Sequence, residues 1–406
     1  MSTFVLASLV ALLLVVTAAL LLRSRLYATF RGVSLGVHIL IAGAIAQRVL
    51  PTPLAPLFIW LHACLFVQAL ALVRPRLRPL WYRALVSIPG SFFGAGTLLA
   101  LPWAVAIGLG FRPWGLWIPY ALALLGVIQS LGSRRDVIHV RVGDRKMVPE
   151  LSRHATLESS AGLPEGPRPL RIMQLSDTHL GPFMSVARLR RIVSRAVAEK
   201  PDLIFLTGDF LTMESQSDPS LLSAALEPLA TLEGRVFACF GNHDHEAPET
   251  VIAALNSARV QLLRDESACV ETVAGLVQVV GLDYVFRGRQ EHLRRVCAEH
   301  PRAIDALRIM LLHDPGAFRH VPDGEAELVL SGHTHGGQVG FLSVGLPFTL
   351  MRILMNAPDH GLWALGQNRL YGHRGTGHYG FPLRLGVPAE ESVLHVHFVE
   401  PDASQV

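Results

Sequence analysis

The first third of the chain consists of long apolar runs separated by short polar breaks. No Asp or Glu occurs before Asp136, whereas both recur throughout the rest of the sequence. An uncharged run of about 20 residues is long enough to cross the hydrocarbon core of a bilayer as a helix. The pattern predicts a transmembrane helical anchor over residues 1–135, with about five spans at 4–22, 33–50, 54–73, 85–110 and 114–131.

Arginines alternate between rich and poor connections in this half. The richer connections hold Arg23, Arg25 and Arg31, then Arg74, Arg76, Arg78 and Arg83, then Arg134 and Arg135, with single arginines, Arg48 and Arg112, between them. Arginine-rich loops stay on the cytoplasmic side of a membrane. Five spans therefore predict an N-terminus outside and a cytoplasmic C-terminal half. No positive charge precedes the first run, which disfavours a cleaved signal peptide.

Two histidines, His38 and His62, fall inside the expected spans. Ionisable residues within a membrane often belong to ion or proton pathways, where they pair with a partner of opposite charge. No span contains an Asp or Glu that could be such a partner. We therefore interpret this half as an anchor and not as a transporter.

Short apolar runs alternate with amphipathic helical patterns in the second half. Residues 136–168 are polar and end in Gly, Pro and Ser, which is typical of a linker. Helices are expected at 185–199 and 220–232, and strands at 170–175, 202–206, 235–240, 273–280, 308–312, 327–330 and 392–398. Strands that alternate with helices predict a layered α/β domain over residues 169–406.

Side chains that bind metals follow five of these strands directly. In chain order they are Asp177 and His179 in SDTH, Asp209 in TGD, Asn242 and His243 in GNHDH, His313, and His333 and His335 in SGHTHGG. Ligands of layered α/β sheets collect beyond the carboxyl ends of strands. In extended chain, residues two apart face the same side, so each D-T-H or H-T-H pair can converge. Glycines at 208, 241 and 332 allow close approach of the backbone. The joint pattern predicts a metal centre.

Charge and cysteine content narrow the function further. The net charge of +4 comes from arginines that flank apolar runs, whereas nucleic-acid-binding proteins concentrate basic residues on one folded face. We therefore expect no nucleic-acid partner. Cys64, Cys239, Cys269 and Cys297 form no CxxC pair, and unpaired thiols suit a reducing compartment.

The ordered set DTH, GD, GNHD, a lone His and GHTH resembles the calcineurin-like metallophosphoesterase superfamily, and the apolar N-terminus with GHTHGGQ is most similar to its membrane-anchored bacterial branch. The resemblance implies a β-sandwich flanked by helices (αββα) that holds two divalent metal ions. It implies that Asp177, His179 and His335 hold one ion, that Asn242, His313 and His333 hold the other, and that Asp209 bridges them. It also implies that His243 binds no metal and acts near the leaving-group oxygen as a general acid or charge stabiliser.

The ligand types narrow the choice of metal. Imidazole, carboxylate and amide groups suit Mn, Fe, Zn or Co better than Ca or Mg. Among these four metals, we expect manganese to be the one that is bound. Two such ions about 3.5–4 Å apart can clamp the attacking and leaving oxygens of a displacement at phosphorus.

The sequence departs from its relatives at Thr212 and in residues 341–363, and a glycine-rich loop follows at 371–380. Thr212 stands where protein phosphatases of this superfamily carry an Asp that pairs with the catalytic His, so a protein phosphatase is disfavoured and Asp244 or His245 is left to orient His243. Residues 341–363 are unusually apolar and form either a buried strand and helix or a lid that meets acyl chains. In the glycine-rich loop 371–380, Arg374 is a candidate phosphate clamp, whereas His373 and His378 have no assigned role.

These features predict a membrane-anchored dinuclear-metal phosphoesterase that hydrolyses a phosphodiester or pyrophosphate bond. Some relatives in the superfamily hydrolyse UDP-diacylglucosamine, so the expected partners are the bilayer and a phosphate-containing, lipid-linked substrate. Two alternatives stay open: a metal-dependent sensor or scaffold, and a phosphodiesterase that acts on a cell-envelope substrate outside the cytoplasm. The expected location is the bacterial inner (cytoplasmic) membrane with a cytoplasmic catalytic domain. No oligomeric state is indicated.

Overall fold

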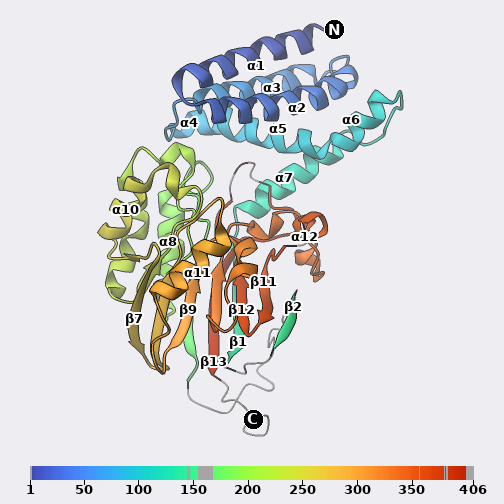
Figure 1. Ribbon diagram of the computed structural model, residues 1–406. Coiled ribbons are helices and arrows are strands. Elements are labelled where there is room, and N and C mark those ends of the chain that lie inside the picture. Colours follow the sequence, from blue (N-terminus) through green and yellow to red (C-terminus); the bar gives the residue numbers. More distant parts are fainter. Residues whose placement is uncertain are drawn as a thin grey trace.

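A computed structural model describes residues 2–143, 147–153, 168–355, 357–378, 380 and 383–398. A layer of apolar helices lies over one end of a mixed α/β domain (Figure 1). The helices of the layer are α1 (Thr3–Leu22), α2 (Arg25–Val49), α3 (Ala55–Ala71), α4 (Leu80–Tyr82), α5 (Ile88–Leu99), α6 (Leu101–Gly108) and α7 (Ile118–Ser130), with a π-helical turn at Arg83–Ser87.

Fewer of these helices can cross a bilayer by themselves than the apolar runs predicted. Among the described residues, α1 and α2 are long and apolar enough, and a third span exists if Leu80–Leu99 and Leu101–Gly108, bent by 56° at Ala100, count as one. Helices α3 and α7 have 17 and 13 residues, short of the roughly 20 that a span needs. The expected five spans therefore become two or three by this measure, because breaks in the helices divide the apolar runs.

Three polar side chains inside the helical layer contact one another. The His62 imidazole lies 2.9 Å from the Ser8 hydroxyl through Nε2 and 3.2 Å from Nε2 of His38 through Nδ1. All three residues are buried. Hydrogen bonds between helices are an ordinary means of satisfying polar groups in an apolar bundle, so this chain of contacts agrees with the interpretation of the helices as an anchor.

Two sheets form the centre of the α/β domain. Within the described residues, one sheet has the strand order β1-β13-β3-β4-β5-β6 and the other β2-β11-β12-β10-β9-β8-β7. The strands are β1 (Arg134–Val142), β2 (Val148–Arg153), β3 (Leu170–Leu175), β4 (Leu203–Leu206), β5 (Val236–Ala238), β6 (Gln261–Leu262), β7 (Glu266–Thr272), β8 (Gly275–Gly281), β9 (Leu307–Leu311), β10 (Leu328–Ser331), β11 (Gly361–Gly366), β12 (Asn368–Gly372) and β13 (Glu390–Phe398).

The sheets and helices are arranged in four layers. The helices of this domain are α8 (Val186–Ala198), α9 (Pro219–Leu226), α10 (Pro248–Ser257), α11 (Arg289–Glu299) and α12 (Leu350–Met355). Ile172 and Phe205 of the first sheet pack against Ile309 and Leu330 of the second in one buried core. Separate cores lie beneath α8, α9 and α10 on one outer face and beneath α11 on the other. The predicted αββα sandwich is confirmed in its layers.

The expected linker over residues 136–168 is wrong in its first half. Strand β1 pairs in parallel with β13 along nine residues, and β2 pairs with β11. Both strands extend the sheets at their edges, so the α/β domain begins at Arg134. Most positions in these edge strands are exposed or half-buried, so the strands carry no apolar run. The end of the expected linker, residues 154–167, lies outside the described residues.

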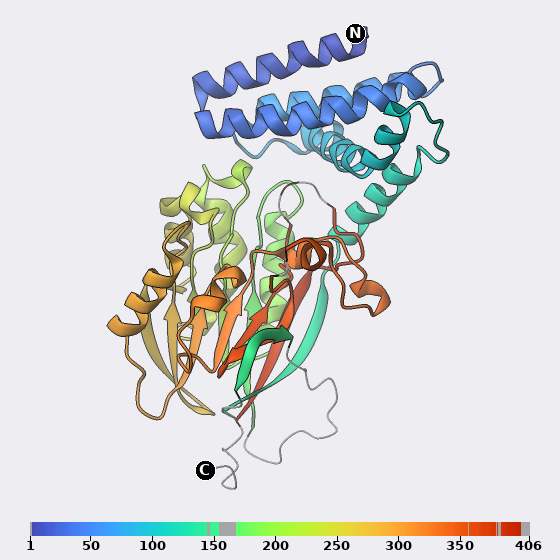
Figure 2. The same ribbon diagram turned by 45° about the vertical axis from the view of Figure 1, so that its right-hand side comes forward.

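Loops that follow the strands lie against the helical layer, as both views show (Figures 1 and 2). Arg23, in the turn between α1 and α2, donates to the Leu72 carbonyl at 2.6 Å and reaches the Met213 sulfur, which lies beyond β4. Arg83 donates to the Pro182 carbonyl beyond β3. The end of the sandwich expected to hold the metal centre therefore faces the helices.

Candidate metal centre

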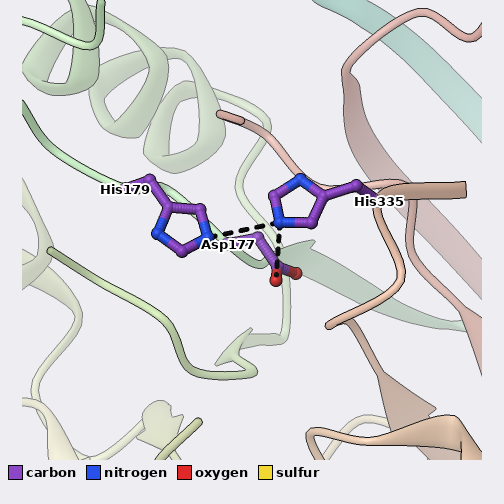
Figure 3. Close-up of side chains that lie close together, drawn as sticks. All are labelled: Asp177, His179 and His335. Atoms are coloured by element: carbon purple, nitrogen blue, oxygen red, sulfur yellow. Dashed lines mark hydrogen bonds and ion pairs between the residues drawn. The ribbon is translucent and has the colours of Figure 1, made fainter. Parts of the chain in front are cut away.

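The first group of predicted ligands comes together at the end of β3 (Figure 3). Nε2 of His335 lies 3.3 Å from Oδ1 of Asp177 and 3.2 Å from Nε2 of His179. The three side chains are buried, and their ligand atoms all lie within 4.8 Å of one another. This spacing leaves room for one metal ion among them.

A second group lies beside the first. Nε2 of His313 lies 3.3 Å from Oδ2 of Asp209 and 3.2 Å from Nδ1 of His333. The ligand atoms of these three residues also lie within 4.8 Å of one another. Oδ2 of Asp209 is also 3.7 Å from Nε2 of His179 in the first group. Asp209 therefore lies between the two groups, and the two histidines of the H-T-H stretch separate, one into each.

Asn242 provides an independent test of fit. Its side-chain oxygen, Oδ1, is buried and has no hydrogen-bond partner among the described residues. Buried polar atoms are almost always satisfied in folded proteins, so an orphaned amide oxygen beside a histidine and carboxylate group fits a metal ligand. The donor set present here agrees with a centre for two ions.

The backbone brings these ligands together in a way that differs from the extended geometry expected. Five of them have positive φ: Asp177 (51°), His179 (41°), Asp209 (57°), His333 (67°) and His335 (52°). The pairs two residues apart thus converge through left-handed turns and not through the alternation of a strand. Left-handed backbone at residues other than glycine is strained and concentrates at functional sites. The fold holds these side chains at an energetic cost.

Glycine is required where segments cross at the centre. A Cβ at Gly332 would lie 1.9 Å from Oγ of Ser176 and 2.2 Å from Oδ2 of Asp177, and a Cβ at Gly241 would lie 2.2 Å from Oδ1 of Asp209. No side chain fits at such distances. The two glycines let the backbone pass directly beside the carboxylates that would bind metal.

Burial controls the ionisation of the first group. Desolvation lowers the pKa of His179 to about 3 and also lowers the pKa of His335 far below its ordinary value. Desolvation raises the pKa of Asp177 to about 6, against the opposing charge of His313. The imidazoles of His179 and His335 are therefore neutral at physiological pH, and neutral imidazole is the form that binds metal.

Two members of the second group, Asp209 and His313, form an ion pair that shifts the pKa of each. Burial opposes charge on both partners, but the ion pair between Asp209 and His313 outweighs it. The pKa of Asp209 is consequently held well below its usual range, and the pKa of His313 is raised to about 10. The Asp209 carboxylate is thus negative, as a bridging ligand must be.

His243 lies at the edge of the centre and is oriented by a residue that the sequence reasoning missed. Its Nδ1 is 2.8 Å from Oε1 of Glu246, its ring centroid is 5.7 Å from that of His179, and its backbone N–H donates to Asp209 at 2.9 Å. Burial lowers the pKa of His243, but the hydrogen bond to Glu246 and the nearby carboxylates raise it above its ordinary value. A 3₁₀ turn at Asp244–Glu246 places residues three apart on one side, and that spacing could have identified Glu246.

Asp244 and His245, the residues expected to orient His243, have other roles. The Asp244 carboxylate accepts the backbone N–H groups of Asp209, Phe210 and Gly241 at 2.7–2.9 Å. It therefore fixes two ligand loops to each other. Nε2 of His245 faces Asp283 at 3.0 Å instead. The expectation for both residues is wrong, because each side chain turns away from His243.

Arg374 is not the phosphate clamp that the sequence indicated. Its Nε donates to Glu390 at 2.6 Å and its Nη2 donates to Asp136. Two carboxylates thus occupy the guanidinium, and these ion pairs join the glycine-rich loop to β13 and β1. His373 is buried beside it and accepts the Gly375 N–H at 2.9 Å. His378 is buried against Phe183, with ring centroids 5.1 Å apart.

The apolar segment 341–363 divides into two parts. Ile353, Leu354 and Met355 of α12 are 65%, 72% and 66% exposed, whereas Leu362 and Trp363 of β11 are buried. The strand is buried, as the first alternative expects, whereas the helix is exposed. The exposed part projects beside α7 at the end of the sandwich that carries the helical layer (Figure 2).

Comparisons with known proteins agree with this centre. The family model for calcineurin-like phosphoesterases matches residues 170–337. Phosphodiesterase YaeI of Escherichia coli (strain K12) is 31% identical over 234 residues, which cover 56% of this chain and 82% of that protein. A transmembrane protein with metallophosphoesterase domain from Danio rerio is 32% identical over 250 residues, 56% of this chain and 53% of its own. The match thus spans about half of that vertebrate relative.

Among solved structures, a 5'-nucleotidase precursor from Thermus thermophilus has a TM-score of 0.28 at 15% identity, covering 41% of this chain and 42% of that chain. That likeness is too slight to bear on activity. Residues 170–337, which the family model matches, include every predicted metal ligand from Asp177 to His335. The alignment with phosphodiesterase YaeI covers 82% of that protein. The chain belongs to the calcineurin-like phosphoesterase family.

Proposed function

We propose that this protein is a membrane-anchored dinuclear-metal phosphoesterase that hydrolyses a phosphodiester or pyrophosphate bond in a lipid-linked substrate. The observation that carries the proposal is the pair of buried ligand groups joined through Asp209. The pair lies at the end of the sandwich that faces the apolar helices. Such a position gives an amphiphilic phosphoester access from the bilayer.

The ligands divide between two ions according to their groups. Asp177, His179 and His335 would hold one ion, Asn242, His313 and His333 the other, and Asp209 would bridge them. Two ions in this arrangement supply Lewis-acid charge to the attacking and leaving oxygens at phosphorus. We expect manganese, and the same ligands accept iron, zinc or cobalt.

His243 is the proton donor in this proposal. Water adds its oxygen to phosphorus, the bond between phosphorus and the leaving oxygen breaks, and that oxygen takes a proton. The His243 ring is held by Glu246 through Nδ1 and lies beside the first ligand group. Its raised pKa favours the protonated form that can give this proton.

The lipid part of the proposal rests on two apolar surfaces. The outer faces of α1 and α2 expose side chains suited to hydrocarbon, including Leu13, Leu21 and Leu40. Helix α12 exposes a further patch beside the same end of the domain. Large exposed apolar patches mark contacts with membranes or other proteins. The catalytic centre would thus work at the bilayer surface.

A substrate comparison tests this proposal. We expect the full chain, reconstituted in lipid nanodiscs with Mn²⁺, to hydrolyse both bis(p-nitrophenyl) phosphate and UDP-diacylglucosamine, with the higher kcat/KM for the lipid. Chelation with EDTA should abolish both activities, and Mn²⁺ should restore them. Turnover of the soluble ester alone would contradict the lipid assignment. Failure of both substrates with metal bound would favour a sensor or scaffold.

The arginine-rich end of the helical layer supports a cytoplasmic position for the catalytic domain. Arg23 and Arg83 both contact the α/β domain, through Met213 and Pro182. Arg78 lies at the same end and donates to the Ala71 carbonyl at 3.1 Å. Because arginine-rich ends stay in the cytoplasm, the catalytic domain would be cytoplasmic whichever number of helices spans the bilayer.

Reporter fusions test the orientation. A green fluorescent protein fused after Val406 should fluoresce, whereas alkaline phosphatase fused at the same position should be inactive, because the first reporter folds in the bacterial cytoplasm and the second outside it. Replacement of Arg74, Arg76 and Arg78 by Gln removes three of the positive charges on which the expected orientation depends, and this variant is the control for charge. The reverse pattern in the unaltered chain would place the catalytic domain outside and favour a cell-envelope substrate.

A further inference from the structure

A cavity of about 340 Å³ lies between the helical layer and the metal centre. Its upper wall is lined by residues three or four positions apart along three helices. Phe30, Ser34 and Val37 of α2 line it, and α3 and α5 contribute residues with similar spacing. Residues three, four and seven apart share one face of a helix. The three helices therefore turn one face each toward the same space.

The inner end of the cavity reaches the candidate metal centre. His179, a member of the first ligand group, lines it together with Phe183 and His378. Nε2 of His378 is buried and has no hydrogen-bond partner in the described part of the chain. An unsatisfied buried nitrogen beside a ligand group is suited to a polar group of a bound molecule.

The outer end opens at the surface of the helices. Phe30, Val37 and Leu98 line the cavity and are 58%, 42% and 41% exposed. All three belong to the apolar layer, α2 itself being long and apolar enough to cross a membrane. Lipid chains around these helices would meet the cavity at this end.

We propose that this cavity binds one hydrocarbon chain of the substrate, with the phosphate at the metal centre and the linking polar group near His378. The proposal rests on the proposed phosphoesterase function and gives its substrate a binding site. Helices α2, α3 and α5 then form part of the substrate site in addition to anchoring the protein.

The lining selects a hydrocarbon chain over a nucleoside or a sugar. Most of the wall is aliphatic and aromatic, and one of its buried polar groups, the Gln68 amide oxygen, already accepts the Ser87 hydroxyl at 2.8 Å. The charged side chains in the lining, Arg31 and Glu214, belong to α2 and to the loop beyond β4. A ring with several hydroxyl or amide groups would compete with bonds already formed, since the hydroxyls of Ser34, Ser87 and Thr212 donate within the protein. The volume is at the lower end of the roughly 300–1,000 Å³ typical of ligand pockets, which suits one chain.

A chain-length comparison tests the site. Methyl and octyl p-nitrophenyl phosphate, used below the micellar concentration with Mn²⁺-loaded protein in nanodiscs, share the reacting bond and differ in the chain. Each buried CH₂ strengthens binding about fourfold at most, and partitioning into the nanodisc lipid reduces this. We expect KM for the octyl ester to be at least tenfold lower than for the methyl ester, with similar kcat.

Two cavity-filling variants and one matched control make the comparison specific. Ser34→Trp on α2 and Ser91→Trp on α5 both fill the cavity, and each should remove the preference for the octyl ester while the protein keeps its bound metal. Leu40→Trp adds the same ring to the exposed face of α2 and should keep the preference. Equal KM values for the two esters in the unaltered protein, or a preference that survives both fillings, would overturn the site.

A binding measurement separates this inference from the proposed function. Octylphosphonate should bind the Mn²⁺-loaded protein at least tenfold more tightly than methylphosphonate by isothermal titration calorimetry, and Ser34→Trp and Ser91→Trp should abolish the difference. If that result holds while neither ester is turned over, the proposed function fails and the chain site stands. If the esters are turned over but the two phosphonates bind equally, the chain site fails alone.

Discussion

Replacement of Asp209 by asparagine should remove bound metal and lower kcat/KM by about a thousandfold or more. The Asp209 carboxylate lies 3.3 Å from His313 and 3.7 Å from His179, one in each ligand group, so its charge serves both sites. Metal ions stabilise the charge of a displacement at phosphorus by several kcal/mol, and about 1.4 kcal/mol corresponds to a factor of ten in rate. Metal content by mass spectrometry and kcat/KM on a phosphodiester measure the two effects.

The asparagine variant keeps the shape of the site, which makes the result interpretable. Asn tolerates the left-handed backbone of Asp209, and its amide oxygen can still accept the N–H of His243. Asp305 is a matched control, because it also has positive φ (56°) but is exposed and distant from the centre. Asp305→Asn should leave metal and rate unchanged. Full metal content in Asp209→Asn would contradict the bridging role.

Replacement of His243 by alanine should lower kcat while the protein keeps its metal. A general acid contributes about 10²–10⁴-fold to a rate, and we expect a loss in that range for esters with alkoxide leaving groups. The loss should shrink to about tenfold or less for p-nitrophenyl esters, because p-nitrophenolate leaves without a proton. Glu246→Gln should reproduce the same dependence on the leaving group more weakly, since Glu246 only holds the His243 ring.

The neighbouring histidine is the matched control for this experiment. His245 belongs to the same GNHDH stretch but faces Asp283, so His245→Ala should retain kcat for every leaving group. Metal lost from His243→Ala would show that His243 is a ligand. An equal loss of rate for good and poor leaving groups would exclude proton donation and leave stabilisation of charge as its role.

Strand ends were predictable because an apolar run gives way to polar residues within two or three positions. Leu175 ends a strand in which every residue except Arg171 is buried, and Asp177 follows two residues later. The same change occurs after Leu206 and Leu330. Strand β3 was predicted with the bounds that the structure gives it, since both of its faces are covered and its sequence is largely apolar. Edge strands β1 and β2 were missed because most of their positions are exposed or half-buried, and their polar sequence resembles a linker.

Residues around the ligands were less predictable, because their partners are distant in sequence. Arg374 is 238 residues from Asp136 and 16 from Glu390, and nothing local distinguishes a structural ion pair from a phosphate clamp. Glu246 was more predictable than these ion pairs, because a local 3₁₀ turn sets its position relative to His243. The conformation of the ligand pairs was also misjudged, because positive φ at five non-glycine residues is imposed by the surrounding loops.

The apolar N-terminal third, the α/β layering and the candidate ligands were all predictable from the amino-acid sequence alone. Each of these is written in local pattern: uncharged run length, alternation of strands with helices, and polar residues at strand ends. The fold was needed to show the left-handed backbone of the ligand pairs, the acid that orients His243, and the opening of the centre toward α2, α3 and α5. Most of those features depend on side chains that approach one another from distant parts of the chain, and such approaches follow from packing and not from any local signal.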